Sequence, residues 1–62
     1  MKRLMIEDMY YNGDEKIFDV IKNSSYDEIF SIMQELEKEN VYKYYNLIMF
    51  LESQLEYTME TL

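Results

Sequence analysis

The chain has 62 residues, with 13 acidic and 6 basic side chains, a formal net charge of −7, and neither cysteine nor histidine. This composition excludes disulfide bonds, zinc sites built from cysteine or histidine, and catalysis by a thiol or an imidazole. It also disfavours direct binding to nucleic acid or to an anionic membrane, because both need a basic surface. We therefore expect one small domain over residues 1–62, with no enzymatic activity, cofactor or metal site.

The first predicted element covers Lys2 to Tyr11. It is followed by Asn12-Gly13, the clearest break in the chain. Its residues do not alternate between apolar and polar, as they would in a half-buried strand. Instead, the apolar residues gather on one side of a helical wheel, opposite Arg3 and Glu7, and this predicts a helix. A β-hairpin that turns at Asn12-Gly13 is the alternative.

The second predicted element is a helix of about eight residues that begins at Asp14, a favourable N-cap residue. Its broad apolar face consists of Ile17, Phe18, Val20 and Ile21.

The third predicted element is a helix from about residue 26 to residue 38. Ser25 and Glu28 have the spacing of a capping box, in which each side chain accepts a backbone N–H of the other residue. Apolar residues then recur at steps of three and four, which predicts a buried stripe of Tyr26, Ile29, Phe30, Met33 and Leu36.

The fourth predicted element is a long helix over residues 41–61, with Asn40 as its N-cap. Its apolar residues follow a heptad pattern. At 1.5 Å per residue it would be about 31 Å long, roughly two turns longer than the preceding helix. We therefore expect an all-α bundle of three or four helices that dimerises through this helix. The expected dimer contacts are Val41, Ile48, Leu51, Leu55 and Leu62.

Three acidic residues of this helix, Glu52, Glu56 and Glu60, are spaced four apart and form one stripe. Like charges at this spacing repel, and acids near a helix C-terminus oppose the helix dipole. A solvated face is the simpler interpretation. The functional interpretation is an anionic ladder for a basic partner, because residues that break local rules tend to serve function.

The seven tyrosines are the second candidate signal. Neighbours in a helix point about 100° apart, so an adjacent pair cannot lie wholly on one buried stripe. We expect Tyr44 to be buried, and Tyr42, Tyr45 and Tyr11 to be partly exposed and to contact a partner. Packing at the boundary of a small core is the alternative.

These features favour an acidic protein that binds and inhibits a basic or nucleic-acid-handling protein. The most specific version of this hypothesis is that the glutamate ladder mimics the phosphates of DNA. Residues with AT-rich codons (Phe, Tyr, Met, Ile, Asn and Lys) make up half of the chain, which indicates a low-GC bacterium, phage or plasmid. An anti-CRISPR protein or a blocker of host transcription or replication, acting in the cytoplasm, would fit. The alternatives are a self-assembling adaptor, or a small regulator of the antitoxin or immunity type that docks through its tyrosines.

Overall fold

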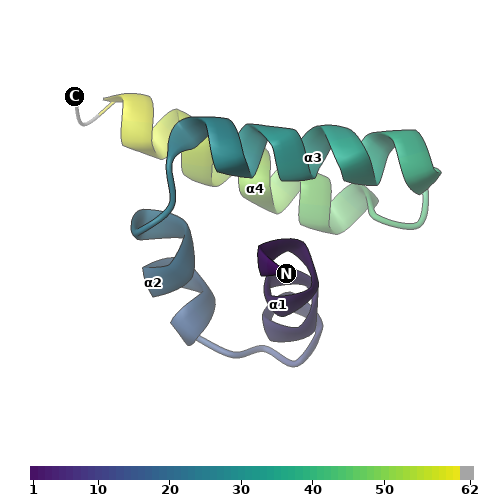
Figure 1. The fold of residues 1–62 in the computed structure, drawn as a ribbon, viewed down its shortest axis with the longest axis horizontal. Coiled ribbons are helices and arrows are strands. Elements are labelled where there is room, and N and C mark those ends of the chain that lie inside the picture. The colour runs from purple at the N-terminus through teal and green to yellow at the C-terminus, as the bar shows by residue number, and fades with distance from the viewer. Residues whose placement is uncertain (61–62) are drawn as a thin grey trace.

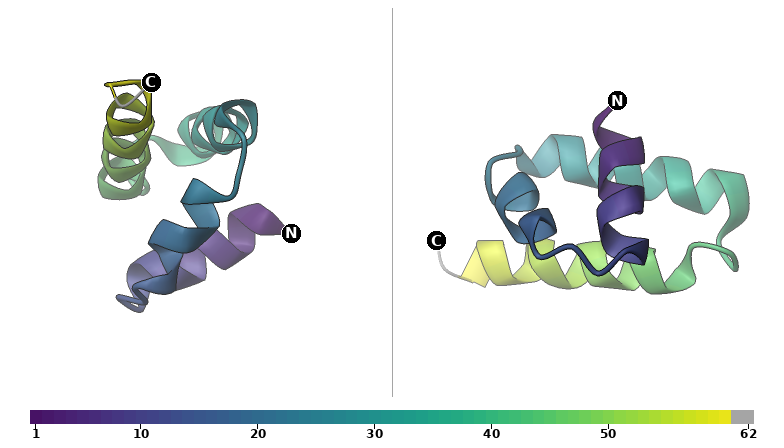
Figure 2. Two further views of the ribbon diagram at one scale, coloured as in Figure 1. Left: turned by 90° about the vertical axis from the view of Figure 1, so that its left-hand side faces the viewer. Right: turned by 90° about the horizontal axis from the view of Figure 1, so that it is seen from below.

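The computed structural model describes the backbone of residues 1–60 and the side chains of residues 1–57. All regular structure in this part is helical, as predicted. The helices are α1 (Lys2–Tyr11), α2 (Lys16–Lys22), α3 (Tyr26–Asn40) and α4 (Tyr45–Glu60). Figure 1 shows α3 and α4 side by side and antiparallel, with α1 and α2 together on one side of this pair. In Figure 2, α1 crosses the pair at a steep angle, so the helices form two layers.

The link between α1 and α2 depends on Gly13, which has a φ of +67°. Its N–H donates to the carbonyl of Tyr10, and the N–H of Asp14 donates to the carbonyl of Met9 at 2.9 Å. These two bonds are the Schellman pattern, which ends a helix with a glycine in the left-handed region. The predicted helix over residues 2–11 is therefore confirmed, and the hairpin alternative is wrong.

Side chains also mark the starts of α2 and α3. The Asp14 carboxylate accepts the Lys16 N–H at 2.9 Å, although α2 itself begins at Lys16 rather than beside Asp14. The predicted capping box of α3 is confirmed. The Glu28 N–H donates to Ser25 Oγ at 3.1 Å, and the Ser25 N–H donates to Glu28 Oε1 at 3.1 Å.

The prediction of a long C-terminal helix over residues 41–61 is wrong. The third helix continues to Asn40, residues 41–44 form a turn, and α4 begins at Tyr45. Asn40 Oδ1 does accept the Lys43 N–H at 3.0 Å, but this bond closes the turn instead of starting a helix. With 15 and 16 residues, α3 and α4 are about 22 and 24 Å long, so no two-turn overhang is left.

The shorter helix also removes the basis for the predicted dimer. Three of the proposed contact residues, Ile48, Leu51 and Leu55, lie in the core of the single chain and are at most 7% exposed. The heptad spacing reflects packing of α4 against its own neighbours. Val41 is exposed in the turn, and Leu62 lies outside the described residues.

The core draws on all four helices and on the turn that precedes α4. Its least exposed members, all at 1% or below, come from α1, α3 and α4: Ile6, Ile29, Leu36, Leu47 and Leu51. Isoleucine and leucine dominate this cluster, and burial of such a side chain contributes about 1.5–3 kcal/mol. The contacts that hold the second layer to the first are therefore mainly apolar.

Charged contacts add to the attachment of α1. The Arg3 guanidinium contacts Glu7 on its own helix and both Glu35 and Glu39 on α3. It also lies over the Tyr44 ring, 5.8 Å from the centroid. Arg3 is well suited to this position because its planar guanidinium can bind several carboxylates and can also lie over an aromatic ring.

Replacement of Leu51 by alanine should lower the free energy of unfolding by about 2–5 kcal/mol, because it leaves a cavity in the core. Met49→Ala, at an exposed position two residues earlier, should cost less than about 1 kcal/mol. Urea titration followed by circular dichroism measures both values. The Leu51 effect should not depend on protein concentration. A loss that disappears at high concentration would instead indicate that Leu51 serves a dimer.

The pH dependence of stability should report on Glu28. Its hydrogen bond from the Lys2 ammonium, followed by that from the Ser25 N–H, lowers the pKa of Glu28 below its usual value near 4.5. The ionised form is therefore favoured by folding, so its contribution is present above the unfolded-state pKa and is lost as pH falls through the folded-state pKa.

Glu28→Gln should consequently reduce the fall in unfolding free energy between about pH 5 and pH 3. Lys2→Met should remove part of the same dependence, because it deletes the salt bridge and leaves the capping box. Chemical denaturation at a series of pH values measures these slopes. An unchanged slope in Glu28→Gln would show that this carboxylate is not stabilised by folding.

Candidate protein-binding surface

The α3–α4 pair has one covered and one uncovered side, and α3 shows which residues lie on each. Figure 1 shows α1 and α2 beneath the pair, while no described helix lies above it. Three α3 carboxylates pair with α1 cations and thus mark the covered flank: Glu28, Glu35 and Glu39. At 100° per residue, Tyr26, Phe30 and Glu37 fall on the other flank of the buried stripe.

The same argument applies to α4. Phe50 contacts Tyr10 of α1, with ring centroids 5.3 Å apart, and Phe18 of α2 at 5.8 Å, so it marks the covered flank. Four exposed residues share the opposite side of the helix: Tyr45, Met49, Glu52 and Glu56. Aromatic, thioether and carboxylate groups therefore form one continuous stripe along α4.

We call this combined surface the hairpin face. It consists of Tyr26, Phe30 and Glu37 on α3 together with Tyr45, Met49, Glu52 and Glu56 on α4. All seven side chains are exposed. Aromatic and methionine side chains are enriched in the cores of protein–protein interfaces, so this surface is the candidate protein-binding site.

The hairpin face is acidic. Glu37, Glu52 and Glu56 form no ion pair or side-chain hydrogen bond with any residue that the structure describes. The only cation in the sequence of α3 is Lys38, which is exposed, and α4 contains none. Glu52 and Glu56 are separated by about 6 Å along the helix axis. The side chain of the third predicted ladder member, Glu60, lies outside the described residues.

The structure divides the predicted tyrosines between different places. Tyr44 is buried, and Tyr42, Tyr45 and Tyr11 are exposed, all as predicted. Tyr45 joins the hairpin face, and Tyr42, which is 90% exposed, lies in the turn between α3 and α4. Tyr11 ends α1 and packs edge-on against Tyr10, with centroids 5.2 Å apart. Partial burial, with a smaller effect from nearby Tyr10, raises the pKa of Tyr11.

Four hairpin-face residues differ from the sequence prediction or carried none. Tyr26 and Phe30 were predicted in the buried stripe of α3, which is wrong because both are more than 40% exposed and Ile32 is buried instead. Their rings stack on each other with centroids 6.0 Å apart. Met49 and Glu37 were not singled out. Met49 could have been predicted on the same side of the helix as Tyr45, because it follows Tyr45 by four residues.

Other kinds of site find little support in the geometry. Within the described part of the chain, no three acidic side chains are grouped closely enough to hold a metal ion. None of the helices described is long and apolar enough to cross a membrane. No protein-family model, curated protein or solved structure matches the chain.

Proposed function

We propose that the protein is an acidic antagonist that binds a basic, nucleic-acid-handling protein through its hairpin face. The observation that carries this proposal is that Tyr45, Met49, Glu52 and Glu56 share one exposed side of α4, where no described cation pairs with the carboxylates. The net charge of −7 adds a long-range attraction to any basic surface.

The two kinds of side chain have different roles in this proposal. The carboxylates of Glu52 and Glu56 attract lysine and arginine side chains that otherwise contact phosphates. The aromatic and methionine side chains provide apolar contact area that excludes water after the encounter. Binding therefore blocks the surface that the partner uses for nucleic acid. Mimicry of phosphates by Glu52 and Glu56 is the most specific form of the proposal, with Glu60 as a candidate third group.

The proposed setting is a phage or another mobile element that acts in the cytoplasm of a low-GC bacterium. The preference for residues with AT-rich codons supports this origin. An anti-CRISPR protein, an inhibitor of host transcription or replication, or a protein of the antitoxin or immunity type would each fit this setting.

A self-assembling adaptor is less well supported. Ile48, Leu51 and Leu55, which were expected to contact a second copy, are already buried in the single chain. Two copies that each carry −7 would also repel each other. Because a tyrosine-driven regulator would bind in a salt-resistant way, salt dependence separates it from the acidic antagonist.

The double variant Glu52→Gln/Glu56→Gln should weaken partner binding by about tenfold and flatten its salt dependence, because two charges are lost without a change in side-chain shape. The measurement is a pull-down from the lysate of a low-GC bacterium with elution in rising salt, followed by titration of the captured protein. The matched control is Asp8→Asn/Glu15→Gln, which removes two exposed carboxylates that are not part of the hairpin face.

DNA should compete with the protein for this partner. Equal loss of binding in the control variant would show that net charge alone matters. A ternary complex of partner, DNA and this protein would contradict the mimicry version.

A further inference from the structure

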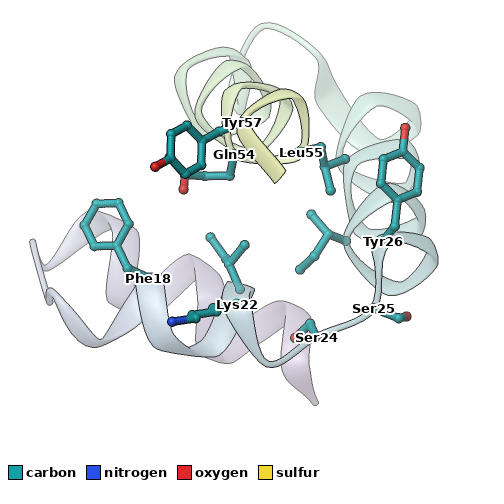
Figure 3. A pocket seen from close by; sticks show the side chains of 10 residues that line it. Phe18, Lys22, Ser24, Ser25, Tyr26, Gln54, Leu55 and Tyr57 are labelled. Carbon is teal, nitrogen blue, oxygen red and sulfur yellow. The ribbon is translucent and has the colours of Figure 1, made fainter. Parts of the chain in front are cut away.

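A pocket opens where α2, the start of α3 and the C-terminal half of α4 meet, and its volume is about 440 Å³. Figure 3 shows side chains from all three elements around it. The buried residues Ile21, Ile29 and Leu55 form an aliphatic floor. Three exposed aromatic residues form the walls: Phe18, Tyr26 and Tyr57. Its volume and apolar lining are within the range of pockets that bind ligands or anchor side chains.

Exposed carboxylates neighbour the aromatic wall residues in sequence: Asp19 follows Phe18, Asp27 follows Tyr26, and Glu56 precedes Tyr57. Because neighbours on a helix point about 100° apart, these carboxylates lie outside the lining of the pocket. None of these carboxylates has an ion pair among the described residues. Among the described residues that line the pocket, Lys22 is the only charged one. Its position in the last turn of α2 is favourable for the helix dipole without any ligand.

The pocket is also continuous with the hairpin face. Tyr26 forms a wall of the pocket and stacks on Phe30, with an angle of 12° between the two ring planes. Tyr57, on the opposite wall, comes seven residues after Phe50 and therefore lies on the covered flank of α4. A partner that covers the hairpin face can therefore reach the pocket past Tyr26.

We propose that this pocket is an anchor site that receives one apolar side chain carried on a basic segment of a protein partner. The inference rests on the proposed function and names the recognition element of that same partner. The aliphatic floor and aromatic walls select an apolar group, and the net charge of −7 attracts the lysines or arginines beside it. A second copy of this chain is a poorer occupant, because its charge of −7 opposes the approach.

The test uses a seven-residue probe peptide with a central phenylalanine, an alanine on each side of it and two lysines at each end. One control peptide replaces the phenylalanine by alanine, and the other replaces all lysines by glutamate. Amide chemical-shift titration should show the phenylalanine–lysine peptide perturbing Ile21, Ile29 and Leu55. Both control peptides should leave these amides unchanged.

Two tyrosine variants of the protein show whether the peptide binds in the pocket. Tyr57→Ser removes a wall of the pocket, whereas Tyr42→Ser removes a tyrosine that is 90% exposed in the α3–α4 turn. The first should weaken peptide binding at least fivefold, and the second should leave it unchanged. Equal perturbation by the alanine peptide, preferred binding of the glutamate peptide, or equal affinities of the two variants would each overturn the anchor site.

The anchor site and the proposed function can fail separately. If the peptide does not perturb the pocket while Glu52→Gln/Glu56→Gln still weakens binding of the captured partner, the anchor site is wrong and the antagonist proposal stands. If the peptide occupies the pocket while that double variant binds the partner normally, the role of the acidic hairpin face is wrong.

Discussion

The apolar seam between α3 and α4 is the contact on which the rest of this structure depends. No cysteine is present to cross-link the chain, so its stability has to come from burial in a domain that is near the lower size limit for independent folding. Leu36, Leu47 and Leu51 are fully buried along this seam. It fixes the two helices as an antiparallel pair and provides the surface on which α1 and α2 pack. The orientation of every exposed residue on α3 and α4 follows from it.

The placement of α1 and α2 on one side of this pair separates the charges of the molecule. Lys2 and Arg3 are neutralised by carboxylates on the covered flank of α3 and within α1. The uncovered side keeps carboxylates that have no ion-pair partner in the part of the chain that the structure describes, next to tyrosine, phenylalanine and methionine side chains. Under the proposed function, the carboxylates attract a basic surface and the apolar side chains then exclude water from the contact.

Local chemistry explains which parts of the fold could be predicted from sequence. The capping box at Ser25 and the break at Gly13 act within a few residues, and both were identified correctly. The start of α4 was missed because the buried Tyr44 keeps the apolar spacing of a helix while it lies in a turn. The glutamates and Tyr45 were recognised as separate candidates. These residues share one surface with Met49 and Phe30 because α1 packs on the other flank of the α3–α4 pair. Sequence spacing does not reveal which flank α1 covers.

Site-specific photo-crosslinking from position 49 can show whether the hairpin face binds a basic, nucleic-acid-binding protein. A photoreactive phenylalanine analogue at Met49 lies in the middle of the α4 stripe, and the same group at Lys16 on α2 serves as the control. The account predicts that position 49 crosslinks a basic, nucleic-acid-binding protein at low salt, that added DNA or high salt suppresses the adduct, and that position 16 gives none. Equal adducts from both positions, or adducts from position 49 that persist in DNA and high salt, would contradict it.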